Sequence, residues 1–406
     1  MVGRPGWERR QLLALAVVGA AALSFAGCDP NKKNPDPTPD PAGGATAPQG
    51  TQEPWKVGAY LSLSGAETQF GIETKEGIEL AVDEVNQAGG AKGRQIKVLY
   101  EDNKSTPQET NNKVLQLITR DKVVALLGEV TSSRSMVGGL VANKHKIPMI
   151  SPSATAPEVT QIGPFIFRVC FTDDIQGKMG AEFVVKTMGK KKVAILFASD
   201  DVYSSGLAQQ FRDESKKLGA EIVIEKSFLK TETNFTTYIN EIRDSKAELI
   251  YAPIFYNAMV PIARQAKAAG VPGSKFVGGD GWDADTLLSD AGDELDGAYF
   301  TNHYAPDVPW PNAQAFLKAY KTRFKRDPTS LSAMGYDSAK LLFDAIGRTK
   351  TDTPEGIRDA IAETKGFAGA TGTITIDPNR NADKSIVIVQ IKNKKFTYYA
   401  AVNEKH

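Results

Sequence analysis

Short β-forming runs alternate with longer amphipathic segments from Trp55 onward, and this alternation constrains the fold more than any other feature of the chain. The strands expected in the first series cover residues 57–61, 96–100, 123–127 and 147–150. The helix expected before Gly89 has one apolar face, which is made of Ile78, Ala81, Val82 and Val85. A strand–helix–strand order of this kind predicts a mostly parallel sheet with helices on both faces.

The alternation restarts after an apolar run around Cys170. The strands expected in the second series cover residues 193–197, 222–228, 249–254 and 276–278. Residues 54–406 are also too many for one hydrophobic core, since cores stop growing at roughly 250–300 residues. The sequence therefore predicts an α/β fold class with two doubly wound parallel-sheet lobes. Ligand sites in such folds lie beyond the carboxyl ends of the strands, so we expect a small-molecule site between the lobes.

The N-terminal segment has the features of a secretory signal peptide. Three arginines precede an uncharged run over 12–27, whose last two residues are small and lead directly to Cys28. The run is too short to span a bilayer, which takes about 20 apolar residues. The small pair before Cys28 resembles the bacterial lipoprotein processing motif, in which the cysteine is lipidated, although Phe25 replaces the usual leucine. We expect residues 1–27 to be removed and Cys28 to carry a lipid anchor. The alternative is an ordinary signal peptide with an incidental cysteine.

Residues 28–53 are expected to be a tether between the lipid and the folded part. The stretch is rich in proline, contains two adjacent glycines and has almost no apolar residue to bury. Such a segment cannot offset its ordering entropy, so it should stay solvated and partly extended. Asp29 resembles the signal that retains enterobacterial lipoproteins at the inner membrane. We therefore expect the protein outside the cytoplasm, lipid-anchored to a bacterial membrane, and on the periplasmic face of the inner membrane in a Gram-negative cell.

Composition argues against several other functions. The formal charge is +1, and it becomes −1 when residues 1–27, with three arginines and one glutamate, are removed, so nucleic-acid binding is not expected. His145, His303 and His406 have no metal-ligand spacing, so we expect no metal and no other cofactor. Cys170 is the only cysteine besides Cys28, and its apolar surroundings predict a buried, inert thiol. Because neither G-x-S-x-G nor the phosphate-loop pattern is present, a secreted hydrolase is the least favoured function.

Two loops that leave neighbouring strands of the first series carry hydroxyl groups. Gly128–Ser133 follows the third strand, and Ser151–Glu158 follows the fourth. Both loops lead toward helices at the same edge of one sheet. Since helix N-termini attract anions, a carboxylate fits at this edge without a positive side chain. The alternative is that Ser132 and Thr155 only cap their helices.

Seven motifs with a shared resemblance occur in order from about residue 56 to the C-terminus. They are Leu63-Ser64-Gly65 with Gly71, Gly128 with Thr131-Ser132-Ser133, Ser151 to Glu158, Arg168 with Asp173-Asp174-Ile175-Gln176-Gly177, Tyr203 to Leu207, Gly278 to Trp282, and Gly335-Tyr336-Asp337. Together they resemble the leucine/isoleucine/valine-binding proteins of bacterial amino-acid ABC importers. The resemblance implies a type I periplasmic binding protein with three crossovers between its lobes. It places lobe one at 55–172 with 302–378 and lobe two at 173–301 with 379–406.

The resemblance also implies which residues bind the ligand. The carboxylate of an amino acid would bind at Ser132 and Thr155. Its ammonium would bind at the backbone carbonyl of Ser153 and at Asp280, an acid that is one methylene shorter than the glutamate of the best-known members.

Aromatic residues complete the implied site. Tyr203 would close over the ligand, and a second ring would come from Tyr256 or from its neighbour Phe255. Three further rings either wall the pocket or belong to the core: Phe70, Trp282 and Tyr336. The early disulfide of the family is missing, because Lys104 and Thr131 stand at its positions.

The leading functional expectation is a solute-binding lipoprotein that captures an amino acid, of branched-chain type by the resemblance, and delivers it to an ABC permease. Binding energy would drive a hinge closure about the crossovers rather than catalysis, so we do not expect an enzyme. The expected partners are the amino acid and membrane permease subunits, and the chain is expected to act as a monomer. A sensor lipoprotein that reports the ligand to a signalling partner is the alternative with the same fold.

Overall fold

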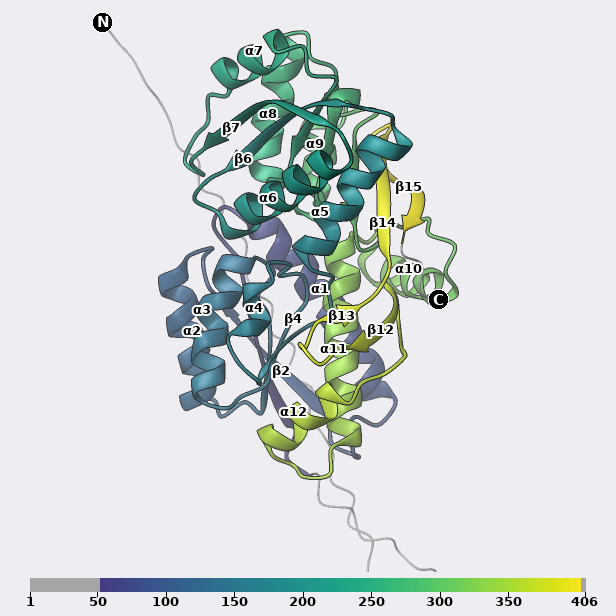
Figure 1. The fold of residues 1–406 in the computed structure, drawn as a ribbon. Helices are drawn as coiled ribbons and strands as arrows, with labels where there is room; N and C mark the ends of the chain where they lie inside the picture. Colours follow the sequence, from purple (N-terminus) through teal and green to yellow (C-terminus); the bar gives the residue numbers. More distant parts are fainter. Residues whose placement is uncertain (1–51, 403–406) are drawn as a thin grey trace, which may run out of the picture. The chain divides into compact units, whose positions relative to one another are not determined.

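Two large sheets organise the computed structural model, which describes residues 52–402 (Figure 1). The predictions for the signal peptide, for Cys28 and for most of the tether lie outside the described residues, as does His406. The described residues belong to one compact unit. Within residues 52–402, no helix combines the length and the apolar character that crossing a bilayer requires.

The first sheet is entirely parallel and has the strand order β2-β1-β3-β4-β5. Its strands are β1 (Trp55–Leu61), β2 (Ile96–Asp102), β3 (Ala125–Leu127), β4 (Met149–Ser151) and β5 (Ile166–Arg168). The helices between them are α1 (Thr68–Gln87), α2 (Pro107–Thr119), α3 (Ser132–Lys144) and α4 (Glu158–Gln161). The start of α2 shows how local sequence sets these elements, because the Thr106 hydroxyl accepts a hydrogen bond from the Glu109 amide and Pro107 opens the helix.

The second sheet has the order β15-β14-β10-β9-β8-β6-β7. Its parallel strands are β6 (Lys192–Ala198), β7 (Glu221–Phe228), β8 (Leu249–Ala252), β9 (Phe276–Gly278) and β10 (Tyr299–Asn302). Two antiparallel strands extend it, β14 (Ile386–Lys392) and β15 (Lys395–Val402). Its helices are α5 (Asp173–Glu182), which continues into a π-helical turn, α6 (Val202–Lys217), α7 (Thr236–Asp244), α8 (Tyr256–Ala268) and α9 (Asp285–Ala291).

The remaining elements follow β10 and precede β14. They are α10 (Pro311–Phe324), α11 (Ser330–Arg348), α12 (Pro354–Ala362) and a three-stranded sheet of β11 (Phe367–Gly369), β12 (Gly372–Ile376) and β13 (Ala382–Asp383). α11 packs along α1 (Figure 1). Two glycines allow this contact: a Cβ on Gly77 would lie 1.9 Å from the Ser332 carbonyl oxygen, and a Cβ on Gly335 would lie 2.3 Å from that of Thr74.

The predicted fold class is confirmed, since both large sheets have parallel cores and belong to two lobes. Other features were not anticipated. The β14–β15 hairpin and the small third sheet were not predicted, and the apolar run around Cys170 forms only the short strand β5. The lobe boundaries remain predictions. Because β13 pairs with β12, the chain joins the second sheet at β14 and not directly after residue 378.

Candidate functional site

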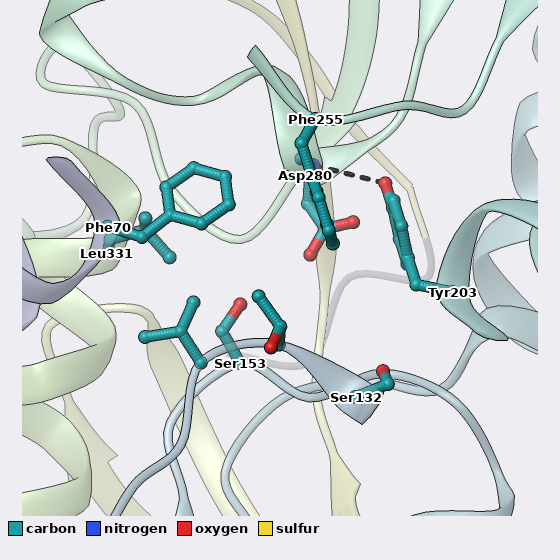
Figure 2. A pocket seen from close by; sticks show the side chains of 10 residues that line it. Phe70, Ser132, Ser153, Tyr203, Phe255, Asp280 and Leu331 are labelled. Atoms are coloured by element: carbon teal, nitrogen blue, oxygen red, sulfur yellow. Dashed lines mark hydrogen bonds between the residues drawn. The ribbon is translucent and has the colours of Figure 1, made fainter. Parts of the chain in front are cut away.

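A small cavity lies between loops at the carboxyl ends of the strands of the two large sheets. Its lining combines residues of both lobes: Phe70, Val130, Thr131, Ser132, Ser153 and Leu331 with Tyr203, Phe255, Asp280 and Gly281. Figure 2 shows Asp280 on the opposite side of this space from Ser132 and Ser153. Asp280 is the only charged residue in this lining. The cavity has a volume of only about 10 Å³, which is roughly the room that one water molecule needs. Its walls must therefore separate to admit a larger ligand.

The N-terminus of α3 reaches the cavity because a buried acid holds the loop before it. Glu129 Oε2 accepts hydrogen bonds from the Thr131 amide and hydroxyl, both at 2.8 Å, and Oε1 accepts one from the Ser62 hydroxyl at 2.7 Å. Burial alone would raise the pKa of Glu129. The Arg134 guanidinium, with its Nε 3.3 Å away, and these hydrogen bonds outweigh burial and lower that pKa below its usual value. The acid therefore stays ionised and holds the loop.

Ser132 and Thr155 come from the two predicted loops, and neither side chain caps a helix. Ser132 Oγ accepts a hydrogen bond from the Ala156 amide at 3.1 Å, which ties the loops together and leaves its own hydrogen free to donate. Thr155 is not in the cavity lining but is buried, and its Oγ1 lies near the Asp173 carboxylate without meeting hydrogen-bond geometry. A buried hydroxyl without a partner is unfavourable by roughly 1–3 kcal/mol, so Thr155 can gain from an incoming acceptor.

Only one of the two expected helix N-termini is present at this edge. α3 has 13 residues, whereas α4 has four and begins only at Glu158. The expectation of two anion-attracting termini side by side is therefore corrected to the terminus of α3 alone. The second loop contributes hydroxyl and carbonyl groups instead.

A buried arginine shapes the loop that carries Ser153. The Arg168 guanidinium donates hydrogen bonds to the carbonyls of Ala154 at 2.6 Å and Ala156 at 2.8 Å. The Cys170 Sγ lies 3.3 Å from the same Ala154 carbonyl, and burial raises the pKa of Cys170 to about 12. The prediction that this thiol is buried is confirmed.

Asp280 is buried on the lobe-two side of the cavity, with 6% of its surface exposed. Its Oδ1 accepts a hydrogen bond from Gln176 Nε2 at 2.6 Å, and its Oδ2 lies 3.2 Å from His303 Nε2. Burial, followed by the charge of Asp280, raises the pKa of the neighbouring Asp173 well above its usual value. Asp280 thus has two side-chain partners within the protein, Gln176 and His303.

Three aromatic rings stack around the cavity. Phe255 is parallel to Tyr203, with ring centroids 5.2 Å apart, and Phe70 meets Phe255 edge-on at 5.5 Å. The Tyr203 hydroxyl accepts a hydrogen bond from the Gly281 amide at 3.1 Å, drawn as the dashed line in Figure 2. Packing of this kind holds the rings in defined positions at the wall of the cavity.

The second ring at the cavity comes from Phe255 and not from Tyr256. The Tyr256 hydroxyl donates a hydrogen bond to the Ala66 carbonyl and accepts one from the Gln69 amide, each at 3.3 Å. Tyr256, the first residue of α8, therefore contacts both the loop before α1 and the first turn of α1. Of the two alternatives that the sequence left open, Phe255 lines this cavity and Tyr256 does not.

Trp282 and Tyr336 also lie outside the cavity lining. Trp282 is fully buried and donates its indole N–H to the Ala252 carbonyl at 3.0 Å, so it belongs to the core behind Asp280. The Tyr336 hydroxyl donates to Glu84 at 2.6 Å, between α11 and α1. Of the two alternatives for Trp282, pocket wall or core, the structure therefore favours the core, where its indole N–H is already hydrogen-bonded.

Several residues of the site were not predicted from the sequence. Val130 and Leu331 line the cavity, and Gln176 and His303 contact Asp280. Gln176 stands in a quoted motif, and His303 directly follows β10, so its place beyond a strand end was the available signal. No comparable signal marks Leu331, which comes from α11. Within residues 52–402, no group of three or more metal-ligating side chains is close enough to hold a metal ion.

The chain is similar to proteins of known function. It matches the family model described as "Periplasmic binding protein" over residues 54–395. An amino acid binding protein from Pseudomonas aeruginosa is 31% identical over 58% of this chain and 63% of its own length. The crystal structure of a leucine-binding protein from Thermotoga maritima has a TM-score of 0.81 and 32% identity, and the match covers 86% of this chain and 98% of that one. The substrate-binding protein of a branched-chain amino acid transporter from Streptococcus pneumoniae, solved in complex with isoleucine, gives the same values.

The family-model match, over residues 54–395, includes strands of both large sheets and the helices between them. Proteins of this family bind solutes outside the cytoplasm, and they are not enzymes. The chain therefore belongs to the periplasmic binding protein family, as a type I solute-binding protein of the branched-chain amino acid group.

Proposed function

We propose that this protein binds a neutral α-amino acid in the cavity between its lobes. The observation that carries the proposal is the position of Asp280, a buried acid on the opposite side of the cavity from the α3 N-terminus and Ser132. Asp280 would bind the ammonium of the ligand, with the Ser153 carbonyl as a second acceptor. The hydroxyls of Ser132 and Thr155 and the positive end of α3 would bind its carboxylate.

The remaining walls indicate an aliphatic side chain. Phe70, Val130, Phe255 and Leu331 supply apolar surface, and no lysine, arginine or histidine lines the cavity to pair with an acidic side chain. A polar ligand side chain would lose its hydration there without gaining a partner. We therefore infer leucine, isoleucine or valine as the ligand class, which agrees with the isoleucine bound by the relative from Streptococcus pneumoniae.

Binding would work through closure of the lobes. The Tyr256 hydroxyl already joins the lobes through Ala66 and Gln69, and the cavity is nearly filled, so ligand entry requires them to open. The closed, loaded form would then be presented to the permease of an ABC importer. In this proposal Tyr203 closes over the ligand, and the chain acts as a monomer.

A lipid on Cys28 would keep the receptor close to that permease. The support is the signal-peptide pattern before Cys28 and the proline-rich stretch after it. Cell fractionation tests the anchor: Cys28→Ala should move the protein from the membrane to the soluble extracytoplasmic fraction with an unchanged melting temperature. Retention of the variant in membranes would contradict the anchor without affecting the proposed ligand.

Thermal shift of the Cys28→Ala protein against the twenty amino acids tests the ligand class. L-leucine, L-isoleucine or L-valine should raise the melting temperature, because a ligand at a hundredfold excess over its Kd stabilises by about 2.7 kcal/mol. 4-Methylpentanoate, which lacks the ammonium, and isoamylamine, which lacks the carboxylate, should give little shift. Equal shifts with either analogue, or no shift with any amino acid, would contradict the proposal.

A further inference from the structure

A buried histidine stands directly behind the acid of the proposed ligand site. His303 is fully buried, and its Nε2 lies 3.2 Å from Asp280 Oδ2. Its ring stacks on Phe171 with the centroids 3.8 Å apart, and its amide donates to Asn302 Oδ1 at 2.8 Å. The ring and the backbone of His303 are therefore both fixed, so the imidazole can act as a rigid support.

Each oxygen of the Asp280 carboxylate has one hydrogen-bond donor on the side that faces away from the cavity. Gln176 Nε2 donates to Oδ1 at 2.6 Å, and His303 Nε2 is the donor available to Oδ2. Each carboxylate oxygen can accept two hydrogen bonds, so both oxygens keep an acceptor position for the cavity side. Two donors behind the group also set its rotation, since losing either one would free the carboxylate to turn.

We propose that His303 is a positioning residue that holds the Asp280 carboxylate toward the ligand ammonium and makes ligand affinity depend on pH. The proposal rests on the proposed function, because it needs a cationic group of the ligand at Asp280. His303 does not line the cavity and acts only through Asp280.

Burial, more than any neighbouring charge, favours a neutral imidazole at His303. Burial lowers the pKa of His303 below its usual value of 6.5, and Asp280 opposes this shift only in part. The other titratable groups that face the pair are Asp173, Cys170, Lys384, Tyr203 and Tyr251, with Asp283 one residue further away through Asn302. Lys384 disfavours a second positive charge at His303.

The direction of the pH effect follows from charge. A protonated His303 would place a positive charge beside Asp280, where it competes with the ligand ammonium. The ligand-bound form therefore holds this proton less tightly than the free form, and affinity must fall as the pH drops below the pKa of His303. Above pH 6.5 the imidazole is mostly neutral, so His303 itself contributes little to any change of affinity with pH there.

Calorimetric titration of L-leucine into the Cys28→Ala protein between pH 5 and 8 tests the proposal. We expect His303→Leu to weaken binding roughly tenfold or more at pH 7.5, because it removes a hydrogen bond to a charged group. His303→Gln keeps an N–H donor, so it should bind within a few-fold of the parent at pH 7.5. It should also lose the part of the affinity decrease that the parent shows below pH 6.5.

The exposed His145 provides the matched control, since His145→Gln should change neither the affinity nor its pH profile. Parent-like binding by His303→Leu, or the same pH profile in His303→Gln and the parent, would overturn the role of His303 while leaving the proposed function intact. If His303→Leu fails to fold, the His303→Gln profile alone decides. If the parent protein binds no amino acid, the proposed function fails and this inference fails with it.

Discussion

At the scale of single residues, the partners of a buried carboxyl group decide whether it carries charge. Glu129 is paired with Arg134, and its pKa is lowered despite complete burial. Glu73 is buried as fully, but its hydrogen bonds come from neutral donors: Gln69 Nε2 at 2.8 Å, the Asp285 amide at 3.0 Å and the Thr329 hydroxyl at 2.8 Å. Burial, with the charges of Asp285 and Asp283, raises the pKa of Glu73 to about 8.

Glu73 should therefore make the folded state less stable as the pH rises. The native protein holds this proton up to about pH 8, whereas an unfolded glutamate releases it near pH 4.5. Stability falls with pH across that window, by at most about 1.4 kcal/mol per pH unit from this group. Glu73→Gln removes this titration. In thermal melts between pH 6 and 9, the stability of the variant relative to the parent should therefore increase as the pH rises. The exposed Glu363→Gln is the control, and a constant difference between parent and Glu73→Gln would contradict the argument.

The positions of some individual site residues could be predicted from the sequence, and those of others could not. The acid at Asp280 and the hydroxyl at Ser132 follow strand ends, and strand ends of a parallel sheet meet at one edge, so their placement could be predicted. The roles of Phe255 and Tyr256 could not be predicted, because sequence does not show which of two neighbouring rings turns toward the cavity. The contact between His303 and Asp280 joins the ends of β9 and β10, and only the sheet order reveals it.

At the scale of elements, the helix pair α1 and α11 shows how two distant segments become one unit. Gly77 of α1 lies so close to α11 that a Cβ would be 1.9 Å from the Ser332 carbonyl oxygen. Leu331 reaches the cavity from the first turn of α11, and Phe70 reaches it from the first turn of α1. The sequence did not predict this pairing, because α1 and α11 each have an apolar face that could cover either sheet.

Gly77→Ala should therefore lower the melting temperature clearly. The added methyl group meets backbone and not a side chain that can rotate away, and overpacking of this kind costs about 1–3 kcal/mol. Gly347→Ala is the matched control in α11, where a Cβ meets nothing within 4 Å, and a helical alanine should stabilise by up to about 1 kcal/mol. Calorimetry measures the melting temperatures of both variants against that of the parent. A Gly77→Ala protein as stable as the parent would disprove the close contact.

At the scale of the whole molecule, two parallel-based sheets place their strand ends around one cavity. The alternation of strands and helices was sufficient to predict the two lobes. It was not sufficient to predict the β14–β15 hairpin, which adds antiparallel strands to the second sheet after a long excursion through α10, α11 and α12. After α12 and the small third sheet, the chain returns to the second sheet, where β14 pairs with β10. Local sequence patterns do not encode a pairing between strands so far apart in the chain.

The central claim is that the two lobes bind an amino acid between Asp280 and the α3 N-terminus. Calorimetric titration of L-leucine into Asp280→Asn tests it most directly, because the substitution keeps the size of the side chain and removes its charge. Loss of one partner of a buried charge pair costs about 2–5 kcal/mol, so affinity should fall roughly 30-fold or more, while the exposed Asp290→Asn binds like the parent. An Asp280→Asn protein with the affinity of the parent would contradict the claim.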